Sequence, residues 1–82
     1  MNKKLLTKAT TFVVKFWDEN GKCIKELAFP KYKFSLNDVT SYLKGKEDTC
    51  DIYECRYDKN RSQYITNGRT IVWNGDAWVT QM

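Results

Sequence analysis

The sequence has 82 residues, of which 41% are hydrophobic, 15% aromatic and 29% charged, and its formal net charge is +4. A chain of this length forms one domain with a modest core, which excludes a large internal substrate cavity and leaves function to the surface. The composition is typical of a folded chain and excludes a disordered one.

Charge is distributed unevenly along the chain. Residues 1–33 carry eight Lys against three acids, residues 34–58 carry three cations against six acids, and residues 59–82 carry three cations against one acid. The ends are therefore basic and the middle is acidic. This pattern has two interpretations: solubility with pairing inside the chain, or attraction to an acidic partner, either nucleic acid or an acidic protein face.

The N-terminal stretch and the number of cysteines indicate in which cellular compartment the protein is expected. Residues 1–10 contain three Lys, no acid and no long apolar run, so we expect a flexible basic arm there and neither a signal peptide nor a membrane span. An odd count of three cysteines fits a reducing compartment. We expect a cytoplasmic protein, in the host cytoplasm if it is viral, with no membrane partner. Residues 11–82 are expected to form a single α+β domain.

The first two strands, Thr11 to Trp17 and Cys23 to Phe29, are expected to form a hairpin across Asn20-Gly21. A two-residue turn there opposes Lys15 to Glu26, whereas a three-residue loop would oppose like charges. That register also opposes Trp17 to Ile24. It gives an apolar face, expected to be the core side, made of Phe12, Val14, Phe16, Leu27 and Phe29. The partly wet face carries Val13, Lys15, Trp17, Ile24 and Glu26.

A short helix is expected over Ser35 to Lys44. Ser35 is a suitable N-cap, Asp38 completes a capping box, and Gly45 ends the helix. One face of this helix should pack on the sheet, and it carries Leu36, Val39, Thr40 and Leu43. A helix this short depends on that packing for its stability.

A third strand, Cys50 to Tyr57, and a turn, Asp58 to Ser62, follow a polar loop. Lys59 and Arg61 are expected at the tip of that turn. Cys50 and Cys55 are five positions apart on the strand, so their side chains point to opposite faces and a disulfide between them is not expected.

The closing stretch, Gln63 to Thr80, contains Asn67-Gly68 and Asn74-Gly75, each expected to form a two-residue type I′ turn. Those turns pair Tyr64 with Ile71 and Val72 with Ala77. The aliphatic face is expected to turn to the core, with Ile65, Val72, Ala77 and Val79. The more exposed face carries Tyr64, Arg69, Ile71, Trp73, Asp76 and Trp78. The expected fold is α+β, a bent antiparallel sheet of five or six short strands with one short helix packed on it, in the order ββαββββ.

Catalytic chemistry is poorly represented in the sequence. It has no His, no zinc-type Cys spacing and no Gly-rich phosphate loop, since the Asn-Gly pairs are accounted for by turns. We therefore expect a protein that is not an enzyme, with no catalytic residues, no metal site and no cofactor.

The residue types that dominate binding surfaces are better represented. The candidate partner-binding residues are Trp17, Tyr64, Arg69, Trp73, Trp78, Lys59 and Arg61. Aromatic and basic groups on a sheet fit two functions: protein recognition, or stacking of nucleic-acid bases with contacts to the backbone. We favour an acidic protein surface, because the acidic middle would repel a polyanion and the basic residues do not form one run.

In size and plan the chain resembles small phage-encoded inhibitors of host or defence proteins, such as anti-CRISPR proteins. This resemblance implies blockade of a host or defence protein that handles nucleic acid, and it assigns no residue. Residues 64–81 also resemble the small chitin-binding module, with Tyr, Gly, Val, an Asn-Gly turn and an aromatic residue at similar spacing. Carbohydrate binding is therefore a third hypothesis, although the first hairpin and the helix do not belong to that module.

Overall fold

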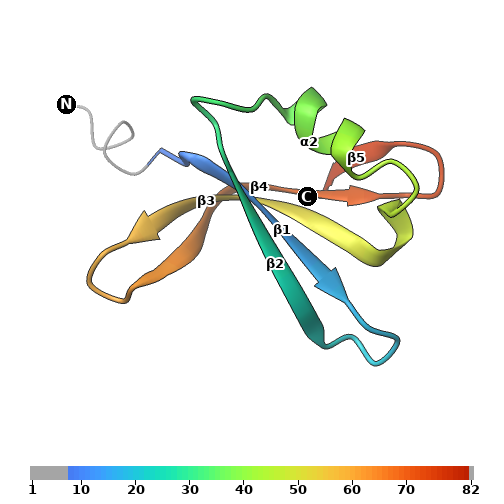
Figure 1. The fold of residues 1–82 in the computed structure, drawn as a ribbon, viewed down its shortest axis with the longest axis horizontal. Helices are drawn as coiled ribbons and strands as arrows, with labels where there is room; N and C mark the ends of the chain where they lie inside the picture. Colours follow the sequence, from blue (N-terminus) through green and yellow to red (C-terminus); the bar gives the residue numbers. More distant parts are fainter. Residues whose placement is uncertain (1–7, 82) are drawn as a thin grey trace.

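The structure, a computed structural model, describes residues 8–81. Its five strands form one antiparallel sheet (Figure 1). The spatial order is β2-β1-β3-β4-β5. The elements are β1 (Thr11–Trp17), β2 (Cys23–Pro30), α2 (Leu36–Tyr42), the 3-10 turn η1 (Glu47–Thr49), β3 (Cys50–Asp58), β4 (Gln63–Trp73) and β5 (Trp78–Gln81). The predicted fold class, α+β with one short helix on a bent antiparallel sheet, is confirmed, with five strands.

Residues 1–7 of the predicted N-terminal arm lie outside the described residues. The last residues of that stretch contact the sheet. Ala9 is buried, and the Thr10 amide donates a hydrogen bond to the Cys55 carbonyl at 2.8 Å.

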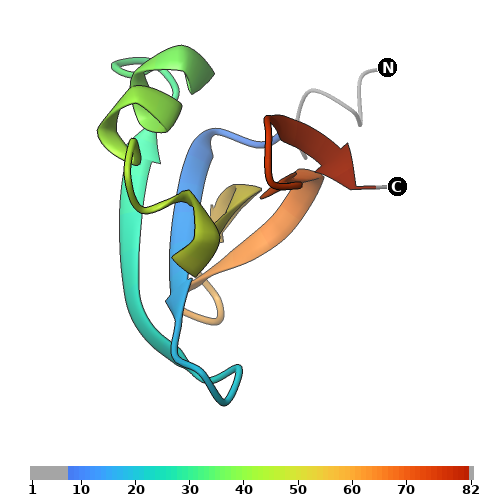
Figure 2. The same cartoon turned by 90° about the vertical axis from the view of Figure 1, so that its right-hand side faces the viewer.

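The core lies between the helix and the sheet face that the first hairpin was expected to bury. The side chains that form it come from β1, the start of β3, β4, and the helix with its C-cap: Phe12, Val14, Phe16, Val39, Leu43, Cys50, Ile52 and Ile71. Leu27 and Phe29 pack at its edge. Figure 2 shows α2 on one side of the twisted sheet. The alternation of side chains along β1 and β2 therefore predicted correctly which face of the hairpin turns to the core.

Helix α2 begins as its sequence indicates. The Ser35 hydroxyl accepts from the Asp38 amide at 3.1 Å, and the Asp38 carboxylate accepts from the Ser35 amide at 2.9 Å. These two bonds form the predicted capping box. Gly45 follows the helix with φ +90°, a left-handed conformation that glycine adopts without steric penalty.

The first hairpin has the predicted register for most of its length but not the predicted turn. Lys15 lies opposite Glu26, whereas Trp17 lies opposite Cys23 and not Ile24. The Asp18 amide bonds the Lys22 carbonyl, so the loop has three residues, 19–21. Ile24 is an extra residue on β2 that restores the register and keeps Lys15 away from Lys25.

The predicted hairpin at Asn67-Gly68 is wrong. Strand β4 runs continuously through this pair and lies beside β3, with Tyr64 opposite Tyr57 and Ile71 opposite Ile52. The predicted pairing of Tyr64 with Ile71 therefore does not occur, and one long strand replaces two short ones. A long neighbouring strand offers β4 more backbone bonds than a turn would.

The hairpin at Asn74-Gly75 is present, with a different register. Val72 lies opposite Val79 and not Ala77, because the loop has four residues, 74–77. The face assignment is also wrong. Ile71 belongs to the core and Trp78 packs against it, whereas Val79 is 38% exposed. The pairing of Ile71 with Ile52 places Ile71 on the core side, which the local sequence of β4 does not reveal.

The sheet face opposite the helix is hollowed. Residues of β2 and β4, which have two other strands between them in the sheet, line the same cavity of about 270 Å³. Such an arrangement requires strong curvature, and β1 and β2 cross β3 and β4 steeply (Figure 1 and Figure 2). Val13 was expected on a partly wet face, but it is buried, as is Cys55 in the same hollow.

Candidate partner-binding surface

The three tryptophans contribute to the fold more than to an exposed face. The Trp17 indole Nε1 donates to Asp51 Oδ2 at 2.9 Å, which ties β1 to β3. Trp73 and Trp78 pack edge to face, with ring centroids 5.5 Å apart, and Trp78 also contacts the core. All three are half-buried. The predicted exposed aromatic face is therefore not formed by these residues.

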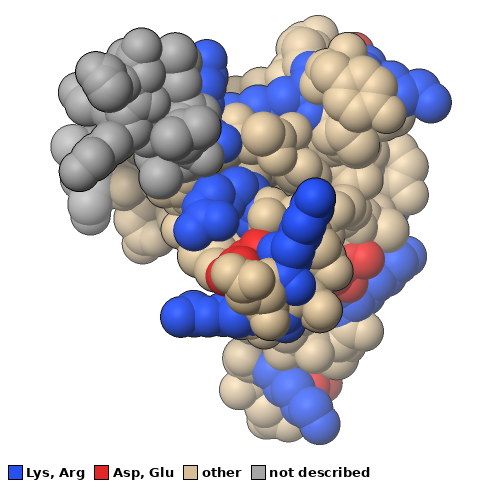
Figure 3. All heavy atoms as spheres, turned by 90° about the vertical axis from the view of Figure 1, so that its left-hand side faces the viewer, with Lys and Arg blue, Asp and Glu red and all other residues tan. Residues whose placement is uncertain are grey.

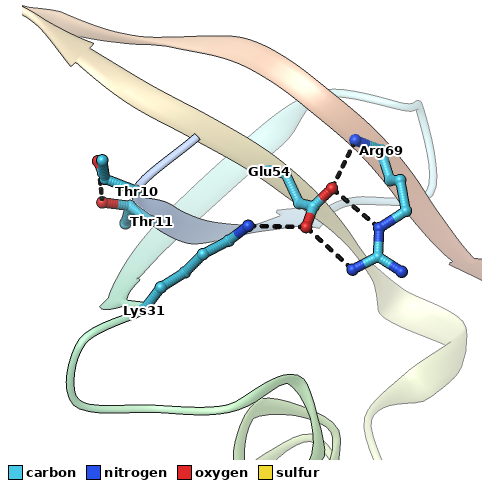
Figure 4. A network of polar contacts seen from close by, with 5 residues as sticks. All are labelled: Thr10, Thr11, Lys31, Glu54 and Arg69. Atoms are coloured by element: carbon cyan, nitrogen blue, oxygen red, sulfur yellow. Dashed lines mark hydrogen bonds and ion pairs between the residues drawn. The ribbon is translucent and has the colours of Figure 1, made fainter. Parts of the chain in front are cut away.

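Arg69 is held by a buried carboxylate (Figure 4). Its Nε and Nη2 donate to Glu54 Oε1 and Oε2, each at 2.9 Å, and its backbone amide donates to Oε1 at 2.7 Å. Lys31 Nζ donates to Oε2 at 2.8 Å from the chain segment after β2. The Glu54 side chain is 8% exposed, so one buried anion is neutralised by two cations.

These partners fix the protonation state of Glu54. The hydrogen bonds from Arg69, followed by those from Lys31, lower the pKa of Glu54 to about 2, against a usual 4.5. The same contact raises the pKa of Arg69. Glu54 is ionised at neutral pH with both oxygens occupied, so it is not suited to general acid or base catalysis.

Asn67-Gly68 forms a bulge within β4 and not a turn. Tyr53 pairs with Thr70 and Cys55 with Thr66, so three residues of β4 lie opposite the single residue Glu54. A Cβ added at Gly68 would lie 2.9 Å from Glu54 Cβ and from Oε1. Glycine is needed at this bulge for close approach, and its φ is not among the positive ones.

The end of the β3–β4 ribbon projects beyond the rest of the sheet. Strand β1 begins at Thr11, opposite Cys55. Within the described chain, residues 56–58 and 63–65 therefore pair with each other but have no β1 residues beside them. We name residues 56–65 the β3–β4 arm; it points to the left in Figure 1. It carries three cations and one acid, a net +2. The predicted candidates Lys59, Arg61 and Tyr64 lie on this arm.

Two exposed tyrosines pack together on the arm. Tyr57 is 48% and Tyr64 39% exposed, and their rings meet edge to face with centroids 5.1 Å apart. At the tip, Asp58 accepts from the Asn60 amide at 3.0 Å and lies 3.7 Å from Arg61 Nε. The tip is therefore a fixed turn that presents charge of both signs beside two aromatic rings.

Tyr32 is a candidate that the sequence reasoning missed. It is 89% exposed and lies in the turn after β2, between Lys31 and Lys33. The Lys31–Glu54 bond anchors this turn to β3 at the base of the arm. The signal in the sequence was an aromatic residue between two lysines directly after Pro30. Figure 3 looks onto this end, over which Lys and Arg side chains outnumber acidic ones.

The hollow on the sheet face opposite the helix has a volume of about 270 Å³. It is lined by Val13, Lys15, Glu26, Cys55, Gln63, Tyr64 and Thr66. Burial raises the pKa of Cys50 to about 11 and also raises that of Cys55, so neither thiol is an activated nucleophile. Cys50 lies in the core and Cys55 in the hollow, on opposite faces as predicted, and both are free thiols.

Within residues 8–81, His, Cys, Asp and Glu side chains form no group of three that could bind a metal ion. Over the same range, the helices are too short and too polar to cross a membrane. No protein-family model, no curated protein and no solved structure matches this chain.

Proposed function

We propose that this protein is a non-enzymatic binding protein that contacts an acidic surface of a partner protein. The contact surface is the basic end, which we define as Tyr32, Lys33, Tyr57, Lys59, Arg61 and Tyr64. The observation that carries the proposal is the exposure of three tyrosines close to cations in sequence: Tyr32 in the turn after β2, and Tyr57 and Tyr64 on the β3–β4 arm. Tyr32 in particular is 89% exposed, so its ring contributes little to the fold.

Tyrosine and arginine are enriched among the residues that dominate protein interfaces. The Tyr57 and Tyr64 rings pack against each other, so together they form one partly exposed aromatic pair with charged neighbours, beside the hollow that Tyr64 also lines. An apolar centre with a charged rim is the usual arrangement of a protein interface. The tip also carries Asp58, and charge of mixed sign is better suited to a protein surface than to a row of phosphates.

The form of action that we propose is occlusion. A small, rigid binder without catalytic groups acts by covering the surface of its partner, as the resemblance to phage-encoded inhibitors of nucleic-acid-handling proteins implies. The acidic surface of such a partner would be the one that attracts the basic end.

The test is affinity capture from a nuclease-treated lysate with the tagged full chain and two matched triple variants. Tyr32→Ser with Lys59→Ser and Arg61→Ser removes one exposed ring and two cations from the basic end. Lys22→Ser with Ile24→Ser and Lys25→Ser removes one exposed apolar side chain and two cations from the first hairpin. We expect the first variant to bind the captured protein at least about tenfold more weakly and the second to bind within about twofold of the wild type.

Equal binding by both variants would remove the basic end from the proposal. Capture of nothing but nuclease-sensitive material would reject a protein partner.

Nucleic-acid binding is the second candidate, and Tyr32 is the observation that favours it. Its ring is almost fully exposed beside Lys33, so this turn has an aromatic group to stack on a base and a cation to contact a phosphate, while Lys31 is engaged by Glu54. The probe is a fluorescent single-stranded oligothymidylate at two salt concentrations. Binding that weakens steeply with salt and is lost in Tyr32→Ser would place this function first.

A further inference from the structure

The hollow on the sheet face opposite α2 has polar walls and a buried floor. Its most buried lining residues are Val13 and Cys55, which are 1% and 2% exposed, and a protonated thiol packs as a small apolar group. The polar lining residues stand on two sides of that floor: Lys15 and Glu26 on β1 and β2, and Gln63, Tyr64 and Thr66 on β4.

The polar side chains of the hollow have hydrogen-bonding capacity that the fold does not use. Lys15 Nζ and Glu26 Oε2 lie 4.0 Å apart, too far for a hydrogen bond, and neither side chain makes one elsewhere within residues 8–81. In the same range the side chains of Gln63 and Tyr64 make none either. The Thr66 hydroxyl has one contact, with the Cys55 thiol at 4.0 Å.

Glu54 shows the contrast, because both of its oxygens are occupied by Arg69 and Lys31. That carboxylate is part of the fold, whereas the polar groups of the hollow converge without protein partners. A small number of convergent polar groups around an apolar floor is the usual make-up of a site for a small ligand.

The Lys15–Glu26 pair indicates which chemical group fits. An ammonium group only donates hydrogen bonds and a carboxylate only accepts them, whereas a hydroxyl does both. An oxygen about 2.8 Å from each atom fits between them, because the 4.0 Å separation is less than twice that length. Lys15 is held in position for such a contact, since its Nζ lies 5.2 Å from the centroid of the Tyr53 ring.

Charge and shape disfavour other ligands. Lys15 and Glu26 carry opposite charges side by side, so an anion or a cation would meet one like charge. A purely apolar ligand would leave the polar walls without water or partners. A nucleobase carries its polar atoms in one plane and mainly along one edge, whereas the polar groups of the hollow stand on two opposite sides.

We propose that the hollow binds one neutral pyranose ring of a saccharide. One hydroxyl bridges Lys15 and Glu26, and hydroxyls across the ring bond to Gln63 and Thr66. The C–H face of the ring packs on Tyr64, which is 39% exposed and has an apolar ring surface to offer.

The size of the hollow agrees with a single ring. Sites for drug-sized ligands begin at about 300 Å³, so a volume of about 270 Å³ suits a molecule of about a dozen non-hydrogen atoms. At the ligand efficiency of an ordinary small ligand, such a molecule binds with a dissociation constant on the order of a few mM. This binding is a second function, separate from the proposed protein contact, although Tyr64 belongs to both sites.

The test is a titration of the full, isotopically labelled chain with neutral pyranoses, each to about 100 mM, followed by amide chemical shifts. The probes are D-glucose, D-galactose, D-mannose, D-xylose, N-acetylglucosamine and N-acetylgalactosamine. At least one should give saturable shifts concentrated on residues 13–15, 26, 55 and 63–66, with a dissociation constant on the order of a few mM.

Two pairs of matched variants locate the site. Glu26→Ala and Thr66→Val each remove one hydrogen-bonding group from the hollow, so each should bind the pyranose at least about fivefold more weakly. Glu19→Ala and Thr80→Val make the same changes at exposed positions that do not line the hollow, and they should bind within about twofold of the wild type.

The absence of saturable shifts with every pyranose, or equal weakening in the hollow variants and their controls, would overturn the proposal. Saturation of the same residues by 1-methyluracil and by none of the pyranoses would also overturn it, since the hollow would then be a site for a base. Tyr32→Ser separates the two functions: it should weaken the proposed protein contact and leave pyranose binding unchanged.

Discussion

Asn20-Gly21 and Asn67-Gly68 are the same dipeptide, yet the chain reverses at the first and runs straight through the second. At the first, Gly21 has φ +81° and the Asp18 carboxylate accepts from the amides of Asn20 and Lys22. At the second, Gly68 has no positive φ, and Glu54 of the neighbouring strand occupies the space a side chain would need. The dipeptide permits a turn, but the neighbouring groups decide whether one forms.

The difference separates a local cause from a distant one. Asp18 is two residues from Asn20, so the first turn is determined within its own segment. Glu54 is 15 residues from Arg69 and 23 from Lys31, so the bulge in β4 depends on contacts between segments far apart in the sequence.

The largest effect is expected from Glu54→Ala. The change leaves Lys31 and the Arg69 side chain without an anion and the Arg69 amide without its acceptor. We expect the free energy of unfolding to fall by about 3 kcal/mol, measured by urea unfolding. Hydrogen exchange should show lost amide protection around residues 66–70 before β1 is affected.

Glu26→Ala is the control for that change. Glu26 faces Lys15 at 4.0 Å and its side chain is 53% exposed, so its removal should cost less than about 0.5 kcal/mol. Similar losses in the two variants would mean that Glu54 has no special role in β4.

The acid response of the protein tests the same carboxylate. The folded pKa of Glu54, about 2, lies below its usual 4.5. Its contribution is therefore fully present above the unfolded pKa and is lost as the pH falls through the folded one. We expect about 3 kcal/mol of the free energy of unfolding to disappear between about pH 5 and pH 2.

Glu54→Gln keeps the shape of the side chain and does not titrate. Urea unfolding across the same pH range should show a less stable protein at neutral pH with a flatter acid response. Parallel profiles for the two proteins would assign the acid response to other carboxylates.

Gly68→Ala and Gly21→Ala compare crowding with backbone strain. A Cβ at Gly68 meets Glu54 at 2.9 Å, whereas a Cβ at Gly21 meets nothing within 4 Å. We expect Gly68→Ala to lower the free energy of unfolding by about 1–3 kcal/mol through overpacking. Gly21→Ala should cost about 1 kcal/mol through its left-handed backbone.

Asparagine at the two positions distinguishes these causes. Asn tolerates the left-handed region, so Gly21→Asn should recover stability relative to Gly21→Ala. Gly68→Asn adds bulk against Glu54 and should be worse than Gly68→Ala. Thermal unfolding of the four variants measures both differences, and the same order at both positions would reject the distinction.

The parts of the fold that the sequence predicted correctly depend on nearby residues. The capping box of Ser35 and Asp38, and the register of Lys15 with Glu26, follow from residues close together or joined by one turn. The path of β4 was not predictable in this way, because it depends on Glu54 and on the pairing of Ile52 with Ile71. That pairing also reverses the face that β4 turns to the core.

The candidate binding residues also differ in whether the local sequence or the strand pairing determines their position. Lys59 and Arg61 lie at a turn that the local sequence indicated, and Tyr64 follows it at the start of β4, so all three lie on the arm. Trp73 and Trp78 face the core side because of the strand pairing, which the sequence did not reveal. Tyr32 was missed because an aromatic residue in a connecting segment cannot be told from a packed one until its exposure is known.

The smallest effect is expected where the asparagine side chains themselves are compared. Asn74 Oδ1 accepts from the amides of Asp76 and Ala77, each at 2.9 Å, and so closes the loop before β5. The Asn67 side chain makes no such bond within residues 8–81. We expect Asn74→Ala to lower the free energy of unfolding by about 1 kcal/mol and Asn67→Ala by less than about 0.5 kcal/mol.

Asp18→Ala, which removes the acceptor of the first turn, should lower the free energy of unfolding about as much as Asn74→Ala. Urea unfolding of the three variants decides the point: if Asn67→Ala were as costly as Asn74→Ala, the Asn67 side chain would have a role in β4 that the bulge at Glu54 does not explain.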